Sequence, residues 1–282
     1  MHRAENEPDD GGSIPGSPRL SDSPPVGEPL VVSRRRGGTK PAEAAVVVPT
    51  GPLAGQVGLV TGAAGEIGGA FVDALVDRGA RVLLVDDDLD SLRDAAARLP
   101  SDDRAVVLRC DLSSVDDVEA TCEFVRLAGA SVDLVVHAAS TVPAPTADAV
   151  EALDRQYAVG VRAPTLLSSR LAPSMSATAG VLFVDREPPP DDAGGTARRA
   201  VLDAARQGLV DVLRHELVAD GVRLLSASCS PSSDAAEFAS VVLDAACRPG
   251  VARVTSLSVG ATLPVDPALP GDPTRPDAQP ID

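Results

Sequence analysis

The segment Thr61-Gly62-Ala63-Ala64-Gly65-Glu66-Ile67-Gly68 limits the possible folds of this chain more than any other part of the sequence. It follows directly on a short apolar run, residues 57–61, and opens a helical pattern with Phe71 and Leu75 on one face. A glycine-rich turn between a strand and a helix is typical of a β-α-β unit that binds a dinucleotide. We therefore expect an α/β protein built around a nucleotide site.

Each glycine of this turn has its own expected role. Gly62 permits a tight turn, Gly65 lets the backbone approach a pyrophosphate, and Gly68 lets the helix pack close to the strand. Ile67 lies in the first turn of the helix, where free N–H groups and a partial positive charge attract phosphate. We predict that Gly62, Gly65, Ile67 and Gly68 bind the cofactor. The alternative is a plain strand-to-helix turn without a ligand.

Strand and helix patterns alternate from this turn to residue 259. We expect strands at residues 57–61, 81–86, 105–110, 133–138, 181–184, 222–228 and 251–259, and helices after the glycine turn and at 89–99, 115–127, 148–173, 196–219 and 235–246. Aromatic residues make up only 2% of the chain, so Val, Leu, Ala and Ile must form the core, which suits strands buried on both faces. The expected fold is one doubly wound parallel sheet of the Rossmann type, about seven strands in the order 3-2-1-4-5-6-7.

The two ends of the chain have a different composition from its middle. Residues 1–53 and 262–282 are rich in proline, and such segments bury too little apolar surface to offset the entropy of ordering. We expect disordered tails there and one domain at 54–261. Ser33-Arg34-Arg35-Arg36 is faintly similar to a twin-arginine export signal, but the apolar stretch that should follow stops at Pro49, which favours a solvated basic patch. An incorrectly assigned translation start would also explain the first tail.

Charge and cysteine content exclude several classes of partner. The formal net charge is −16, which disfavours nucleic acid and anionic membranes as general partners. The four cysteines form no C-x-x-C pair and have no histidine at metal spacing, so we expect no metal site and a reducing, cytoplasmic location. No apolar run reaches the roughly 20 residues that a membrane span needs.

Asp86 ends the second expected strand. A carboxylate at this place accepts hydrogen bonds from the ribose hydroxyls of the adenosine and repels a 2′-phosphate. Asp87 and Asp88 follow, and the next cation along the chain is Arg93. We therefore predict NAD rather than NADP as the cofactor, the alternative being an ordinary Asp-rich turn at a strand end.

The glycine spacing, Asp86, the triplet Cys110-Asp111-Leu112 and the run Val135-Val136-His137-Ala138-Ala139 together resemble the short-chain dehydrogenase/reductase family, over about residues 53–259. The resemblance implies that Asp111 contacts the adenine edge and that Ala138 lines the cofactor. It also implies a two-fold homodimer or heterodimer through the helices at 148–173 and 196–219. The glycine spacing resembles that of the extended subgroup, whereas the domain length resembles the shorter subgroup, whose second glycine falls at Glu66.

The catalytic half of the resemblance is missing. The family uses a Tyr-x-x-x-Lys pair with a Ser and an Asn. The run at residues 203–209 is similar to the K-A-A-x-x-G-L segment that contains the family's Lys. This register puts Arg199 at the Tyr position, Asp203 at the Lys position, Arg186 at the Ser position and Gly160 at the Asn position. An arginine does not deprotonate in ordinary proteins and cannot serve as a general base, and Asp203 has the opposite charge to the Lys that it replaces.

Two functional hypotheses follow. The first is a non-catalytic relative, a pseudoenzyme that acts by binding NAD(H) or as a partner subunit. The second is an active NAD-dependent oxidoreductase whose acid/base group has moved to Asp203, Asp185 or His137. We expect His137 to support the turn at its strand end rather than to react, and Tyr157, the sole tyrosine, to be a packing residue.

Overall fold

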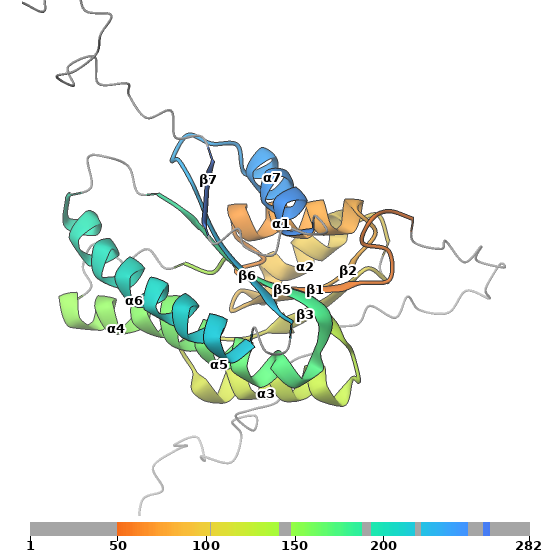
Figure 1. Cartoon of the computed structure of the whole chain (residues 1–282), viewed down its shortest axis with the longest axis horizontal. Helices are drawn as coiled ribbons and strands as arrows, with labels where there is room; N and C mark the ends of the chain where they lie inside the picture. The colour runs from red at the N-terminus through yellow and green to blue at the C-terminus, as the bar shows by residue number, and fades with distance from the viewer. Residues whose placement is uncertain are drawn as a thin grey trace, which may run out of the picture.

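The computed structural model describes residues 50–101, 103–140, 148–187, 193–217, 221–247 and 256–259. Within this part of the chain, seven strands form one parallel sheet in the order β3-β2-β1-β4-β5-β6-β7 (Figure 1), which confirms the predicted fold and strand order. The strands are β1 (Val57–Thr61), β2 (Arg81–Asp86), β3 (Ala105–Arg109), β4 (Val132–His137), β5 (Met175–Arg186), β6 (Arg223–Cys229) and β7 (Ser256–Val259). The two tails expected to be disordered lie almost wholly outside the described residues.

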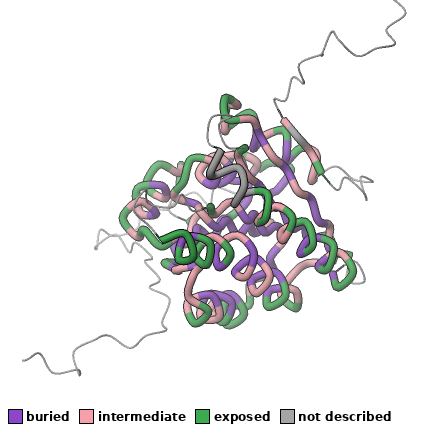
Figure 2. Tube along the Cα trace, turned by 90° about the vertical axis from the view of Figure 1, so that its left-hand side faces the viewer, coloured by how far each residue is buried: buried purple, intermediate pink, exposed green. Residues whose placement is uncertain are grey.

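Helices cover both faces of the sheet (Figure 1). On one face lie α1 (Glu66–Asp77), α2 (Leu89–Arg98) and α7 (Ala235–Cys247). On the other face lie α3 (Val115–Leu127), α4 (Ala149–Tyr157), α5 (Ala163–Leu171) and α6 (Ala193–Leu217). Each side has its own apolar core, and the purple trace in Figure 2 shows the buried strands between these helical layers.

The central strands form because their residues suit burial on both faces. All five residues of β1 are buried, as are the four central residues of β2. Continuous apolar runs of this kind are typical of parallel sheets. Aromatic packing is confined to a few sites, of which the edge-to-face contact between Phe71 of α1 and Phe238 of α7 (centroids 5.9 Å apart) joins the two neighbouring helices.

The elements differ most from the sequence prediction at two places. The fifth strand was predicted at 181–184 but spans 12 residues, because Met175 already pairs with Val132 of β4 before a register irregularity. The helix predicted at 148–173 is not a uniform α-helix, since a π-helical turn (Ala158–Arg162, η1) separates α4 from α5 and a 3₁₀ turn follows. Only the last four residues of the strand predicted at 251–259 lie within the described residues.

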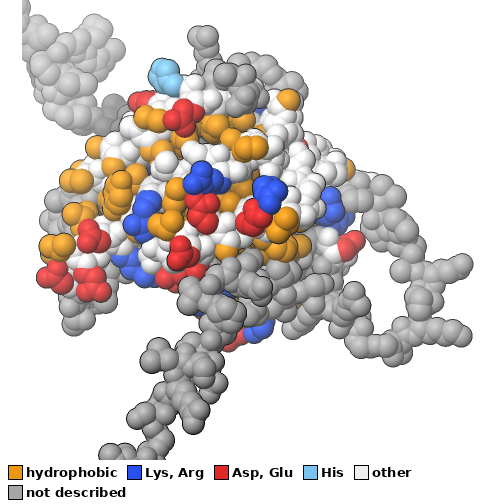
Figure 3. Space-filling model, turned by 90° about the horizontal axis from the view of Figure 1, so that it is seen from below, with side chains coloured by type: hydrophobic (Ala, Val, Ile, Leu, Met, Phe, Trp, Pro, Cys, Tyr) orange, Lys and Arg blue, Asp and Glu red, His pale blue; other side chains and the backbone are white. Residues whose placement is uncertain are grey.

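The surface mixes apolar and charged side chains. Seen from below the view of Figure 1, apolar side chains lie among Arg, Asp and Glu side chains (Figure 3). The large apolar side chains with at least a third of their surface exposed are Val115, Leu127, Val150, Leu153, Tyr157, Val201, Val212 and Val241. Tyr157, predicted to be a packing residue, is 48% exposed. No helix in the described part of the chain is both long and apolar enough to cross a membrane.

Candidate functional site

The glycine turn lies at the carboxyl end of β1, where the strand order reverses between β1 and β4 and where doubly wound sheets bind nucleotides. Gly62 has φ +68°, which favours glycine, and a Cβ there would lie 2.7 Å from the backbone nitrogen of Ala139. A Cβ on Gly68 would lie 2.0 Å from the Gly62 carbonyl oxygen. The backbone therefore requires glycine at both positions, because α1 packs directly against the turn and the turn against the end of β4.

Gly65 has a different role from its neighbours. Its φ of −78° is open to any residue, and a Cβ there would lie 3.3 Å from the Gly62 carbonyl oxygen. It is also the N-cap of α1, and no side chain caps that helix. By contrast, Asp88, Ser114 and Asp148 cap α2, α3 and α4 with side-chain oxygens. The first N–H groups of α1, around Ile67, thus have no side-chain acceptor and suit an anionic ligand.

Asp86 lies beside this turn at the end of β2. Its Oδ2 accepts a hydrogen bond from the backbone N–H of Ala64 (3.1 Å), and its Oδ1 accepts one from the N–H of Asp87 (2.9 Å). Burial raises the pKa of Asp86. Each carboxylate oxygen has a second lone pair, so the group can still accept hydrogen bonds from two ribose hydroxyls. Asp86 therefore holds the turn in place while facing the predicted adenosine site.

Asp111 lies after β3 on the same side of the crevice. Its Oδ1 accepts hydrogen bonds from the N–H and the hydroxyl of Ser113 (2.8 and 2.7 Å). Burial acts to raise the pKa of Asp111, but the bonds from Ser113 and the charge of Arg155 outweigh it and lower that pKa. Ala138 lies on the other side of the turn, where its N–H bonds to the carbonyl of Thr61 (3.3 Å).

Arg155 was not predicted as a site residue. It comes from α4 and reaches over the ends of β2 and β3, where its guanidinium lies 3.5 Å from an Asp87 carboxylate oxygen and 3.4 Å from the Ser113 hydroxyl. The sequence prediction considered only cations that follow Asp86 directly. No local signal in the sequence indicates that Arg155 lies at this site, because it is 68 residues away from Asp87 along the chain.

Two of the residues predicted at the family's catalytic positions, Arg186 and Asp203, form ion pairs. Arg186, at the end of β5, contacts a Glu66 carboxylate oxygen (2.6 Å) and donates to the Pro231 carbonyl (2.9 Å). Arg206 of α6 lies 2.8 Å from an oxygen of Asp185 and 2.6 Å from one of Asp203. None of these pairings was predicted from the sequence, and the side chain of Arg199 lies outside the described residues.

The two remaining features of the predicted catalytic side are Gly160, predicted at the family's Asn position, and the loop after β6. Gly160 lies in the π-helical turn, and nothing stands within 4 Å of a Cβ built there. The loop between β6 and α7 is short, as predicted, since β6 ends at Cys229 and α7 begins at Ala235.

His137 is buried at the end of β4. Its Nε2 lies 3.0 Å from the hydroxyl of Ser168 on α5, its Nδ1 has no hydrogen-bond partner, and its ring lies 5.0 Å from that of Phe183. Burial lowers the pKa of His137 to about 3. The ring is therefore neutral at physiological pH, and it packs between β4, β5 and α5, away from solvent.

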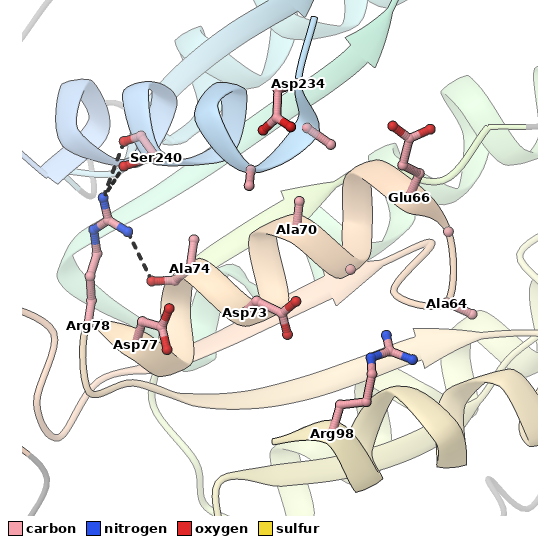
Figure 4. Close-up of a pocket in the computed structure, with 14 residues that line it drawn as sticks. Ala64, Glu66, Ala70, Asp73, Ala74, Asp77, Arg78, Arg98, Asp234 and Ser240 are labelled. Carbon is pink, nitrogen blue, oxygen red and sulfur yellow. Dashed lines mark hydrogen bonds between the residues drawn. The ribbon is translucent and has the colours of Figure 1, made fainter. Parts of the chain in front are cut away.

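An open groove lies on the outer side of α1. It occupies about 550 Å³ between α1, α7 and the end of α2, with Asp73, Asp77 and Arg98 along it (Figure 4). Arg78 joins its two walls through Ser240 and Asp244 of α7. The groove shares residues 64–66 with the glycine turn, but Asp86, Asp111 and Ala138 do not line it. It is therefore separate from the predicted nucleotide crevice. In the described residues no cluster of His, Cys, Asp or Glu is arranged to hold a metal ion.

A doubly wound parallel sheet with an uncapped, glycine-started helix at its switch point defines a Rossmann-type nucleotide-binding protein. The family model of the short chain dehydrogenases matches residues 56–184. The chain belongs to the short-chain dehydrogenase/reductase family.

Individual relatives support this membership. An uncharacterized oxidoreductase of Mycobacterium bovis is 40% identical over 67 residues, 24% of this chain and 27% of that protein. Sorbitol dehydrogenase of Cereibacter sphaeroides is 33% identical over 128 residues, 44% of this chain and 49% of that protein. The matched parts thus span less than half of these curated relatives. A solved metagenomic short-chain oxidoreductase in complex with NADP is 27% identical with a TM-score of 0.62, covering 74% of this chain and 98% of that one.

Proposed function

We propose that this chain binds NAD(H) and acts through that binding, or as the partner subunit of another chain, without catalysing the oxidoreduction of its family. The observation that carries the proposal is the use of Arg186 and Asp203 in ion pairs at two positions where the family needs a proton relay. The glycine turn, the uncapped start of α1 and the carboxylates of Asp86 and Asp111 support retained nucleotide binding.

Proton transfer is the step that this site lacks. Reduction of a carbonyl leaves an alkoxide, which needs a nearby acid of matched pKa. Asp185 and Asp203 both face the Arg206 guanidinium, and His137 is buried and neutral. If the second hypothesis holds, one of these three groups must still supply the proton. Calorimetric titration with NAD and NADH, followed by a hydride-transfer assay on the same preparation, separates binding from turnover.

The cofactor preference is tested at Asp86. We expect NAD(H) to bind more tightly than NADP(H), because a 2′-phosphate would meet the carboxylate. The Asp86→Ala variant should bind NAD more weakly by about tenfold or more, since hydrogen bonds to an ionised group contribute roughly 1.5–3 kcal/mol. Its preference for NAD over NADP should also become smaller. Titration of both cofactors against both proteins measures this.

Asp94→Ala is the matched control, because it removes the same charge from an exposed position on α2. Equal or stronger NADP(H) binding by the unmodified protein contradicts the proposed preference. The solved relative in complex with NADP makes this comparison of the two cofactors necessary.

We also propose that α4 and α6 form a two-fold interface, with a second copy or with a related chain. Val150 and Leu153 on α4 and Val201 and Val212 on α6 are exposed, and Ala200, Ala204 and Gly208 are exposed on α6 as well. Small side chains let helices approach closely, and exposed apolar side chains on two helices are suited to a partner.

The assembly is measured by sedimentation at several protein concentrations. We expect a dimer for the unmodified protein and a shift toward monomer for Val201→Asp with Val212→Asp, because burying two carboxylates without partners is strongly unfavourable. Leu127→Asp serves as the control, since Leu127 is 70% exposed on α3, outside the proposed interface. A mass that stays monomeric at all concentrations rules out the homodimer and leaves only a different partner chain.

A further inference from the structure

One ion pair connects the glycine turn to the far half of the crevice. Glu66 is the first residue of α1, and Arg186 is the last residue of β5. Their side chains meet at 2.6 Å, and the other terminal nitrogen of Arg186 donates to the Pro231 carbonyl at 2.9 Å. Figure 4 shows the Glu66 carboxylate projecting from the start of α1 on the side where α7 begins. The Glu66–Arg186 bridge thus joins α1, β5 and the loop between β6 and α7.

The place of this bridge bears on which part of a dinucleotide the site can hold. In a doubly wound sheet the dinucleotide lies across the crevice, with one nucleoside on each side of the switch point. Asp86 and Asp111 lie on the side of β2 and β3. The second nucleoside must extend over the ends of β4, β5 and β6. The Glu66–Arg186 bridge occupies that second half, because it runs from the turn to β5 and to the loop after β6.

We propose that the site recognises the adenosine diphosphate moiety of its ligand and that the Glu66–Arg186 bridge disfavours a second nucleoside. Adenosine diphosphate, or adenosine diphosphate with a small group such as ribose, then binds better than the whole dinucleotide. This inference rests on the proposed nucleotide binding, and it names the part of the ligand that the site recognises.

The two residues oppose a dinucleotide in different ways. Arg186 fills space at the end of β5, where its side chain is 26% exposed. Glu66 puts a carboxylate in the first turn of α1, next to the N–H groups that suit a phosphate, and Arg186 is the cation that pairs with it. Removing Arg186 alone leaves Glu66 unpaired beside the pyrophosphate. A variant that tests the bridge must therefore change both residues.

The test compares ADP-ribose with NAD by calorimetry on the full chain. We expect ADP-ribose to bind about fivefold more tightly than NAD to the unmodified protein, because opening a partly exposed ion pair costs up to about that factor. In the double variant Glu66→Gln with Arg186→Ser the two affinities should become equal, mainly through tighter NAD binding. The control, Glu119→Gln with Arg170→Ser, removes an ion pair of α3 and α5 outside the crevice and should keep the fivefold difference.

Each outcome decides between the two proposals. Equal binding of ADP-ribose and NAD by the unmodified protein overturns the inference while nucleotide binding stands, and this comparison needs no variant. A fivefold difference that persists in the double variant also overturns it, since the discrimination then has another origin. If neither compound binds, the proposed function itself is wrong, and the inference fails with it.

Discussion

Purified protein is expected to show no appreciable NAD(H)-dependent turnover of alcohols, aldehydes or ketones. A positioned acid or base typically contributes about 10² to 10⁴ in rate, and in the described part of the chain the candidate groups Asp185, Asp203 and His137 are ion-paired or buried. The sequence register predicts Arg199 at the family's Tyr position, and Asp203 lies four residues further along α6, a spacing that ordinarily puts Cβ atoms roughly 5–6 Å apart. Asp203 is moreover paired with Arg206. Absorbance of the reduced nicotinamide, followed with a broad substrate panel, measures the turnover.

Variants identify the responsible group if turnover is found. Activity that disappears in Asp203→Asn, Asp185→Asn or His137→Ala, while nucleotide binding persists, shows that the acid/base group has moved and that the non-catalytic reading is wrong. Arg199→Tyr with Asp203→Lys should not create activity, because Arg186 and the short loop before α7 remain. The decisive measurement is therefore made on the unmodified protein.

The second large effect concerns His137 and the pH dependence of stability. Its pKa is about 3 in the folded protein and about 6.5 in the unfolded chain. Between these pH values the unfolded chain binds one proton more than the folded protein. The contribution of His137 to the free energy of unfolding is therefore complete above about pH 6.5 and is lost as the pH falls toward 3. The total loss is about 5 kcal/mol, of which about 3 kcal/mol falls between pH 7 and pH 4.

The matched comparison uses two histidine variants. His137→Gln removes the titrating ring and keeps a group able to bond with the Ser168 hydroxyl. The free energy of unfolding, from urea titrations between pH 7 and pH 4, should fall by about 3 kcal/mol less in this variant than in the unmodified protein. His215→Gln changes an exposed histidine of α6 and serves as the control. Parallel curves for all three proteins would contradict the argument.

The parts of the structure that the sequence predicted are those that depend on local patterns. Alternating apolar runs and helical faces predict a parallel sheet, and the glycine turn predicts the Rossmann type with its strand order. The close approaches of Gly62 and Gly68 agree with a turn between β1 and α1. The sequence also predicted a short loop between β6 and α7, because Pro231 lies close to the helical pattern that begins at Ala235.

The parts that could not be predicted depend on which distant side chains meet. Glu66 and Arg186 are 120 residues apart, and Arg155 reaches Asp87 across 68. A charged residue has no local signal that identifies its partner, since ion pairs form wherever the fold brings opposite charges together. For the same reason the contact of Arg206 with Asp203 was not predicted.

The bond from the Ala64 N–H to Asp86 has a consequence for how cofactor preference can change during evolution or in the laboratory. In the proposed site, one carboxylate faces the adenosine and also fixes the loop that would hold the phosphates. Exchanging Asp86 for a residue that accepts a 2′-phosphate therefore also loosens that loop, and a successful switch of cofactor needs a second substitution that restores it. A change of cofactor preference at this site therefore passes through a variant that binds nucleotide more weakly, or requires both substitutions at once.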